Sequence, residues 1–280
     1  MKFHRIIRDT GFALALLLLI SALGLQAQSA PKASAKPETY FFLVFSDPAT
    51  GREAEYNKFY DEQHGPDVTS IPGFISGRRY VMADEQLRRV PLIKPKYLIL
   101  YRVETADPVW VRDEIARRLK SGVTRQSSSA VNFKMYTYRK FTPEQTGVGG
   151  DQPSAKPGPK NEYVQIVFGD ATPGQDDDFN HWYNTVHEPE LLAVPGFTKG
   201  DRGIISPVQF THTDEGPTQS KYIAIFELRS SAIQAVFDDN AKLTKVPPSF
   251  DKERTFGYTM RAVGPPMLGD KIRAERAKHP

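Results

Sequence analysis

Two stretches of the chain share one frame. "NHWYNTVHEPELLAVPGF" runs from Asn180 to Phe197, and "NKFYDEQHGPDVTSIPGF" runs from Asn57 to Phe74. Both carry Asn, Tyr, His, Pro and Pro-Gly-Phe at the same internal spacing, 123 positions apart. Self-similarity at a fixed separation is the sequence signature of a repeated structural unit. These two stretches therefore decide how the rest of the chain is interpreted.

The similarity extends beyond the two stretches. Residues 40–80 align with residues 163–203 without a gap, and 14 of the 41 positions are identical. Average composition would give roughly two or three identities over that length. Two further pairs of segments match: "KYLILYRV" (96–103) with "KYIAIFEL" (221–228), and "YTYR" (136–139) with "YTMR" (258–261). We therefore predict a tandem duplication.

The repeats are expected at residues 39–141 and 162–263. Residues 142–161 between them are rich in Pro and Gly and have almost no large apolar residue, which predicts an exposed linker. Residues 28–38 form a second such linker before the first repeat. The charged residues 264–280 are expected to be a loose or strapping C-terminal tail.

Residues 1–27 have the layout of a secretory signal peptide. Lys2, Arg5 and Arg8 precede an apolar run that ends at Leu25, and Ala27 supplies a small residue for cleavage. A run of about 15 apolar residues is short for a bilayer span, which needs about 20. We expect Sec-type export, with the mature protein periplasmic or secreted and without membrane contact. An uncleaved anchor is the alternative.

The composition excludes several partners and stabilising devices. Removal of residues 1–27 takes away three basic residues and Asp9, which lowers the formal net charge from +4 to +2. The chain has no basic helix and no basic patch interleaved with aromatic residues, so we expect no nucleic-acid partner. It has no Cys, so no disulfide can replace burial as the source of stability.

Each repeat has the same expected order of elements. A β-branched and aromatic run ("YFFLVF" or "YVQIVF") predicts the first strand. An amphipathic helix with an acidic first turn follows, and the Pro two residues after each His is expected to end it. A strand after Pro-Gly-Phe, a third strand, a second helix and a last strand complete the unit. Expected bounds are 53–64 and 176–187 for the first helices, 96 and 221 for the start of the third strands, 107–120 and 231–243 for the second helices, and 131–140 and 254–262 for the last strands.

The order β-α-β-β-α-β is the ferredoxin-like unit. Its sheet has helices on one face and leaves the other face bare, and a bare apolar face needs a partner. The sequence therefore predicts an α+β fold, with two tandem ferredoxin-like units packed sheet to sheet as an intramolecular pseudo-dimer. The linker would make intramolecular what a single unit achieves by dimerisation.

The first helix of each unit places an amide, a phenol and an imidazole on one arc. On a helical wheel, Asn180, Tyr183 and His187 lie beside an apolar stripe, at the seam between the buried and exposed faces. The first repeat presents its equivalents in the same way. A structural interpretation is open, in which Asn and Tyr bond backbone carbonyls and His caps the helix C-terminus. A chemical interpretation is also open, because His exchanges protons near neutrality.

"FNHWYNTVHEPELLAVPGF", followed by "TKGDRG", resembles the helix-and-turn signature of the EthD-like branch of the dimeric α/β barrel superfamily. The resemblance covers both repeats. Relatives include cofactor-free monooxygenases, isomerases, polyketide cyclases, dehydratase-decarboxylases and haem-binding enzymes. It implies an acid or base at His187 and His64. It also implies a cavity lined by two matched sets of residues: Asn180, Trp182 and Tyr183, with Asn57, Phe59 and Tyr60.

Two other repeated pairs are candidates for the site. Asp47 and Asp170, just after the first strands, are expected to orient the imidazole or to cap the following helix, and capping is favoured. Arg79 and Arg202 bind an acidic substrate group or pair with a carboxylate, and the sequence does not separate these two roles. The second repeat matches the family pattern more closely, so we favour it as the working site.

Other chemistries lack their residues. A metal centre needs three or four ligands, and each repeat carries only one shared His and no Cys. The chain has no glycine-rich nucleotide loop and no G-x-S-x-G elbow. We expect no metal and no cofactor; haem on His187 is an alternative by analogy alone. The predicted function is a cofactor-independent lyase, isomerase or monooxygenase acting on a small apolar or aromatic oxygenated compound. The alternative is a non-catalytic periplasmic small-molecule binding protein.

Overall fold

The structure is a computed structural model that describes residues 36–86, 95–151, 158–211, 220–243 and 245–278. The expected signal peptide lies outside these residues. Within the described ranges, no helix is both long enough and apolar enough to cross a bilayer.

Two segments of the chain have the same order of elements, and we call them the first half (β1 to β4) and the second half (β6 to β9). The elements of the first half are β1 (Glu38–Pro48), α1 (Glu53–Phe59), the π-helix η1 (Tyr60–His64), α2 (Gly65–Thr69), β2 (Phe74–Met82), β3 (Tyr97–Thr105), α3 (Pro108–Ser121) and β4 (Ala130–Lys140). After β5 (Gln145–Thr146), the second half has β6 (Asn161–Ala171), α4 (Asp176–Trp182), the π-helix η2 (Tyr183–His187), α5 (Glu188–Leu192), β7 (Phe197–Ile205), β8 (Tyr222–Ser230), α6 (Ile233–Asn240) and β9 (Phe250–Leu268), and α7 (Gly269–Lys278) follows.

All the paired strands of the described chain belong to one antiparallel sheet. Its order is β4-β1-β3-β2-β9-β6-β8-β7-β5, and β4 also pairs with β7. The pairs Tyr138↔Ile205 and Tyr80↔Ala262 therefore join the halves along both edges, so the sheet closes on itself. The α+β class expected from the sequence is confirmed. The sequence predicted two sheets packed face to face. In the structure the two halves are also joined by hydrogen bonds between strands, from β2 to β9 and from β4 to β7.

The interior of the closed sheet is one apolar cluster drawn from both halves. Phe41 and Phe45 of β1 lie there together with Ile166 and Phe168 of β6. Because successive residues of a strand point to opposite faces, Phe42, between the two β1 residues, faces the helices instead. Each half therefore buries one sheet face in this shared interior and covers the other with its own helices.

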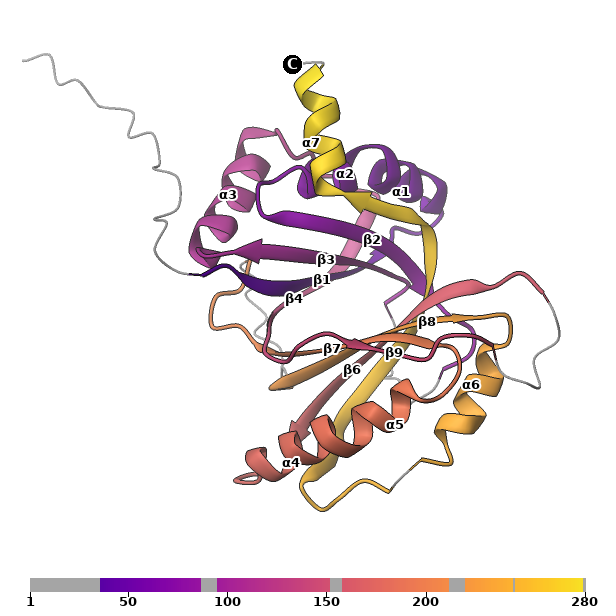
Figure 1. Ribbon diagram of the computed structural model, residues 1–280. Coiled ribbons are helices and arrows are strands. Elements are labelled where there is room, and N and C mark those ends of the chain that lie inside the picture. Colours follow the sequence, from indigo (N-terminus) through magenta and orange to yellow (C-terminus); the bar gives the residue numbers. More distant parts are fainter. Residues whose placement is uncertain (1–35, 87–94, 152–157, 212–219, 244, 279–280) are drawn as a thin grey trace, which may run out of the picture.

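Two further apolar clusters lie under the helices, one in each half. In the first, Val111 and Ile115 of α3 pack with Tyr56 of α1. In the second, Val236 and Phe237 of α6 take the place of the α3 residues. Figure 1 shows α1, α2 and α3 on one side of the molecule and α4, α5 and α6 on the opposite side, with the strands between them.

The first helix of each half does not end at its Pro, and the sequence prediction was wrong on this point. The Gly65 N–H bonds the Tyr60 carbonyl, and the helix continues in a new register as α2. Pro66 has no N–H to donate, and it lies in the first turn of α2, where the register changes. The second half repeats the device, since the Glu188 N–H bonds the Tyr183 carbonyl.

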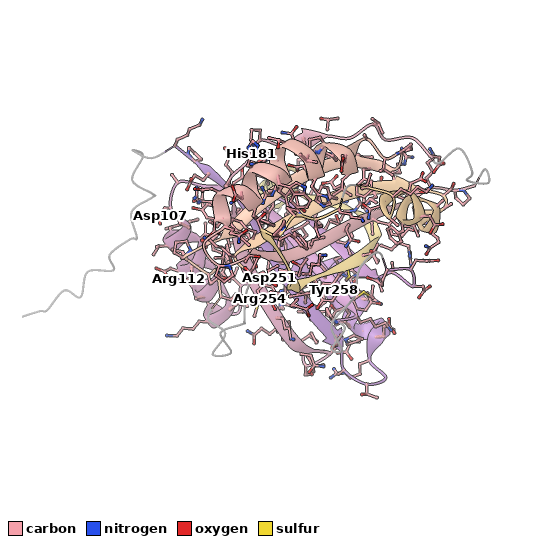
Figure 2. The ribbon with its side chains drawn as sticks, turned by 90° about the horizontal axis from the view of Figure 1, so that it is seen from below. Asp107, Arg112, His181, Asp251, Arg254 and Tyr258 are labelled. Carbon is pink, nitrogen blue, oxygen red and sulfur yellow. The ribbon has the colours of Figure 1, made fainter. Side chains whose placement is uncertain are left out.

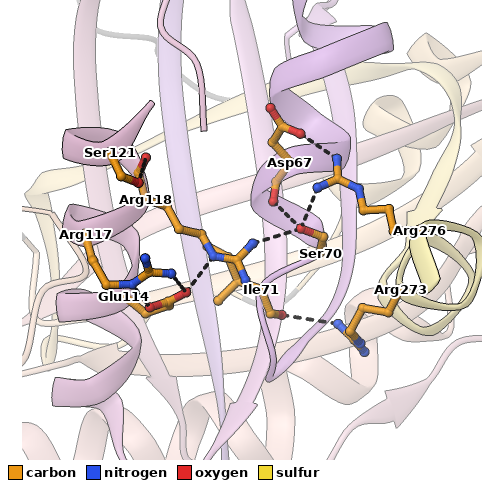
Figure 3. Close-up of polar contacts among 9 residues, drawn as sticks. All are labelled: Asp67, Ser70, Ile71, Glu114, Arg117, Arg118, Ser121, Arg273 and Arg276. Atoms are coloured by element: carbon orange, nitrogen blue, oxygen red, sulfur yellow. Dashed lines mark hydrogen bonds and ion pairs between the residues drawn. The ribbon is translucent and has the colours of Figure 1, made fainter. Parts of the chain in front are cut away.

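The expected linker and tail both contribute strands. Gln145 of β5 pairs with Gly200 of β7, and Met267 near the end of β9 pairs with Gly77 of β2. Strand β9 thus runs past the expected boundary at residue 263, because its last residues add to an edge of β2. Helix α7 then lies beside α2 (Figure 1), where Arg276 binds Asp67, so the tail is a strap over the first half (Figure 3).

Candidate functional site

A cavity of about 600 Å³ lies under the helices of the first half. That volume falls within the usual range for small-molecule sites. Most of its wall is apolar. The apolar lining side chains come from β1, β3, α2 and the turn after it, α3 and β4, and include Phe42, Val44, Val68, Ile71, Ile99, Ile115, Leu119, Ala130, Phe133 and Met135.

Polar groups of the wall lie mainly on α3 and on the segment after it. Arg112 of α3, labelled in Figure 2, is half-buried, and it pairs with Asp113 at 2.8 Å. Helix α3 is fixed by Asp107, which accepts a hydrogen bond from the Trp110 N–H at 2.9 Å. Thr124, Gln126, Ser127 and Thr211 complete the polar lining. Among the described residues that line this cavity, none is a carboxylate.

His64 lies in the wall of this cavity. Its Nδ1 is 2.8 Å from the Arg125 carbonyl oxygen. A carbonyl only accepts, so Nδ1 carries the proton in the neutral ring and donates it there. The lone pair is then on Nε2, which is the nitrogen able to take a proton. Burial lowers the pKa of His64 from its ordinary value, so the neutral, basic form is favoured near pH 7.

The π-helix sets how His64 is presented. Tyr60 and His64 are the first and last residues of η1, and their ring centroids lie 5.1 Å apart in an edge-to-face arrangement. The His64 ring also stacks on Phe59 with centroids 5.3 Å apart. All three residues line the cavity. π-Helical turns of this kind are often found at functional sites.

At the corresponding place in the second half, aromatic side chains pack against one another. A nearby space of about 10 Å³ is lined by Tyr183 and Arg202, among others, but not by His187. Such a volume holds about one water molecule. The His187 ring stacks on Trp182 with centroids 4.7 Å apart, and Phe250 packs against the same indole at 5.8 Å.

This arrangement changes the sequence-based choice of working site. His187 is only 5% exposed and lies against Trp182, whereas the cavity lies beside His64 of the first half. The closer match of the second repeat to the family pattern does not coincide with the larger space. A haem on His187 does not fit this packing, because the imidazole is 5% exposed and one of its faces is covered by the Trp182 indole.

The repeated Asn and Arg residues hold the helix to the sheet. Arg202 is 1% exposed and donates to Asn180 Oδ1 at 2.9 Å and to Asn184 Oδ1. Its guanidinium lies 4.0 Å from the centre of the Tyr183 ring. Burial lowers the pKa of Arg202.

The first half repeats this arrangement with an ion pair. Arg79 donates to Asn57 Oδ1 at 2.6 Å and pairs with Asp61. Neither Asn57 nor Arg79 belongs to the lining of the 600 Å³ cavity. Of the two roles open to Arg79, pairing with a carboxylate is the one observed.

The repeated Asp residues neither cap a helix nor reach an imidazole, so the favoured capping role was wrong. Asp47 accepts from the Lys96 backbone N–H at 2.6 Å, and Asp170 accepts from the Lys221 N–H at 2.5 Å. The residue before α1 is Arg52, and its side chain makes no capping bond. Each Asp instead fixes the start of the third strand of its half, because that backbone N–H precedes the first sheet pairs.

Glu188 is a buried group that the sequence analysis did not select. It is 2% exposed, and burial raises its pKa to about 7. Its Oε1 has no hydrogen-bond partner among the described residues. Its counterpart is Gly65, where an added Cβ would lie 2.7 Å from the Met267 sulfur. In the first half, the Met267 side chain thus fills the space that the Glu188 side chain occupies in the second half.

No group of three or more potential His, Cys, Asp or Glu metal ligands occurs within the part of the chain that the structure describes. His181 lies exposed on α4, away from the cavity of the first half (Figure 2).

Comparisons with known proteins give a likeness of fold. No protein-family model matches the chain, and no curated protein matches its sequence. An anthrone oxidase-like protein is 12% identical, with a TM-score of 0.47, and the match covers 83% of this chain and 93% of that one. A protein named as a monooxygenase, from Lactobacillus acidophilus NCFM, is 10% identical, with a TM-score of 0.45 and coverage of 83% and 97%. Another so named, from Fusobacterium nucleatum subsp. nucleatum, is 10% identical, with a TM-score of 0.49 and coverage of 82% and 94%. At these values the likenesses concern the fold alone.

Proposed function

We propose that this protein binds a small apolar or aromatic, oxygen-bearing compound in the cavity of the first half and acts on it without a cofactor, with His64 as the base. One observation carries the proposal. An apolar cavity of about 600 Å³ has in its wall an imidazole whose tautomer is fixed by the Arg125 carbonyl. The equivalent imidazole of the second half, His187, is 5% exposed and stacks on Trp182 with centroids 4.7 Å apart.

The chemistry follows from the environment of His64. A neutral imidazole in an apolar wall can take a proton from a carbon or oxygen acid of the bound compound. If the proton returns to another atom, the reaction is an isomerisation or a lyase-type elimination. If the deprotonated compound reacts with O₂, the reaction is a cofactor-free oxygenation. Both belong to the proposal, and product analysis distinguishes them.

The proposal includes the origin of the chain as a tandem duplication of an EthD-like unit of the dimeric α/β barrel superfamily. Its support is the matched pattern of contacts between the halves. The side-chain amide of Gln86 bonds the backbone of Thr259, and that of Gln209 bonds the backbone of Thr137. Export to the periplasm or outside the cell is proposed from residues 1–27 alone.

A non-catalytic binding protein is the second candidate. The observation that favours it is the lack of a carboxylate among the residues that line the cavity, which leaves His64 without an acidic partner there. Such a protein would bind the same compounds and be stabilised by them, since a ligand that binds only the folded state raises its stability. It would form no product.

The test compares the two equivalent His residues. The purified protein is screened by thermal shift against phenols, naphthols and hydroxylated polyketide-like compounds, and hits are incubated in air and analysed by mass spectrometry. We expect His64→Gln, which keeps an N–H for the Arg125 carbonyl, to lower turnover about 10²- to 10⁴-fold. We expect His187→Gln to leave turnover of the folded protein within about threefold.

The outcomes separate the candidates. Ligand-dependent stabilisation of the wild type without product supports the binding protein and contradicts the enzyme. Turnover that survives His64→Gln but disappears in folded His187→Gln places the site in the second half. If no compound of these classes stabilises or is converted by the wild type, the proposed ligand class is wrong.

A further inference from the structure

We propose that Phe210, which belongs to the second half, determines which ligand fits the cavity of the first half, and that this ligand is a flat, uncharged or phenolic aromatic compound. The proposal rests on the proposed function, and it concerns the size and chemistry of the ligand. Phe210 follows β7 and is far from the repeated motif in sequence. It nevertheless lines the cavity and belongs to the apolar cluster under the helices of the first half.

Phe210 forms an aromatic wall with residues of the first half. It is 1% exposed, and its ring centroid lies 5.6 Å from that of Phe42 in an edge-to-face arrangement. Phe42 in turn stacks on Tyr101 with centroids 5.8 Å apart. All three rings line the cavity. Aromatic rings at such separations attract one another, because the positive edge of one ring lies near the negative face of the other. A flat aromatic ligand in this space can make the same edge-to-face or offset-stacked contacts with the wall.

The segment that carries Phe210 is firmly attached to β4. The Phe210 N–H donates to Thr137 Oγ1 at 3.1 Å. The Gln209 side chain accepts from the Thr137 N–H at 2.8 Å and donates to the Thr137 carbonyl at 3.0 Å. This amide therefore pairs with β4 as another strand residue would. Because the N–H, the carbonyl and the Oγ1 of Thr137 are all bonded to this segment, the Phe210 ring is a fixed wall of the cavity.

The same attachment occurs in the opposite direction. The Gln86 side chain accepts from the Thr259 N–H and donates to the Thr259 carbonyl, both at 2.8 Å. It thus ties the first half to the helix-facing surface of the second half, away from the cavity. Gln86 and Gln209 form a matched pair, in which only Gln209 positions a residue of the cavity wall.

The charge of the lining restricts the ligand. No carboxylate lines the cavity among the described residues, and its one cationic side chain, Arg112, already pairs with Asp113. A cationic ligand would lose its hydration without gaining a partner of opposite charge. An uncharged or phenolic ring loses little hydration free energy when it enters the cavity, and it gains contact with the aromatic wall. The lining therefore favours the uncharged or phenolic compound.

The experiment measures ligand size preference. Dissociation constants for phenol, 1-naphthol and 9-phenanthrol are obtained by calorimetry for the wild type, Phe210→Ala and Phe210→Leu. Removal of the wall lengthens the cavity, so we expect Phe210→Ala to shift the ratio of 9-phenanthrol to phenol affinity about tenfold or more toward the larger compound. Phe210→Leu should shift it less. We expect 1-naphthylmethylamine, a cation, to bind the wild type at least about tenfold more weakly than 1-naphthol.

Control variants separate ligand fit from stability. Gln86→Ala loses the attachment on the second half and should leave the size ratio unchanged, whereas Gln209→Ala should weaken all three ligands together. An unchanged ratio in Phe210→Ala and Phe210→Leu, with normal binding by the wild type, overturns the inference but not the proposed function. If Phe210→Ala fails to fold, the shift in Phe210→Leu decides. Failure of the wild type to bind any of the three compounds overturns both.

Discussion

The first and second halves share their order of elements and differ in what fills the space under their helices. Ala130 begins β4 opposite Pro48, and Phe250 begins β9 opposite Ala171. These are equivalent positions, since Pro48 and Ala171 are 123 residues apart. Ala130 leaves room and lines the 600 Å³ cavity, whereas Phe250 packs onto Trp182.

The aromatic residue that stacks on the imidazole is also larger in the second half. Phe59 stacks on His64 at 5.3 Å, with an angle of 29° between the rings, while Trp182 stacks on His187 at 4.7 Å and 17°. Larger aromatic groups in the second half thus occupy the volume that is open in the first. Two substitutions far apart in sequence, Ala130 for Phe250 and Phe59 for Trp182, contribute to the difference.

The comparison teaches that the shared Asn and Arg are separable from the site, whereas the shared Tyr60 and His64 line the cavity. The shared Asn and Arg occupy the same contacts in both halves, because Arg79 bonds Asn57 as Arg202 bonds Asn180. Their retention therefore follows from the need to join the first helix to the sheet. Only the positions that differ decide which half can hold a ligand.

The largest expected effect is the loss of the aromatic group that fills the second half. Phe250 is 7% exposed and packs against Phe179 and Trp182. Phe250→Ala should lower the free energy of unfolding by about 3 to 5 kcal/mol, because it removes buried surface and leaves a cavity. Denaturant unfolding followed by circular dichroism measures the change.

Phe133 is the matched control for this variant. It lies in β4, three residues after Ala130, and is 43% exposed, so Phe133→Ala should cost less than about 1 kcal/mol. If Phe250→Ala costs no more than Phe133→Ala, the second half is not filled as described. A Phe250→Ala protein that gains affinity for 1-naphthol would show that the motif of the second half can also support a ligand.

The next effect concerns the pH dependence of stability, and it arises at Glu188 of the second half. Burial raises the folded-state pKa of Glu188 from 4.5 to about 7, so the folded protein keeps a proton that the unfolded chain releases. The stability linked to this proton is complete below about pH 4.5 and is lost as the pH rises through 7. We expect a loss of about 2 to 3 kcal/mol between pH 4.5 and 7.5 from this group.

Glu188→Gln keeps the shape of the protonated side chain and cannot titrate. The free energy of unfolding should therefore fall less steeply between pH 4.5 and 7.5 in the variant than in the wild type. The equivalent position in the first half is Gly65, so the control for loss of a charge is the exposed Glu62 of η1. Equal pH profiles for the wild type and Glu188→Gln would contradict the buried, protonated state of this carboxyl.

A third prediction transfers the filling residue to the first half. Ala130→Phe places a ring where the cavity lies, so it should weaken 1-naphthol binding at least about tenfold, which corresponds to about 1.4 kcal/mol. Stability should change by less than about 1 kcal/mol, because the ring enters existing space. Calorimetry measures binding, and denaturant unfolding confirms the fold. Unchanged affinity in a folded variant would place the ligand elsewhere.

The α+β class was accessible from the sequence because it depends on local periodicity. Alternation such as Phe41, Phe42 and Leu43, with one buried face on each side of the strand, follows from the strand period itself. The cavity depends instead on residues such as Ala130 and Phe210, which both line it but lie in different halves and in no shared motif. No local pattern marks either residue, whereas the closer match of the second repeat to the EthD-like pattern directed attention to the second half.

The smallest effect concerns the strap, which adds a helix to the first half only. Arg276 of α7 pairs with Asp67 and donates to Ser70 Oγ at 3.1 Å, and Arg118 of α3 donates to the same hydroxyl at 3.0 Å (Figure 3). Arg276→Ala should lower the free energy of unfolding by about 1 kcal/mol, because this pair is half-exposed. Lys278, paired with Glu275 on the exposed side, is the control, and Lys278→Ala should have no measurable effect.

Since Arg118 lies on α3, which covers the cavity, Arg276→Ala should also weaken 1-naphthol binding by about twofold. Equal stability and affinity in the two variants would mean that α7 does not support the helices over the cavity.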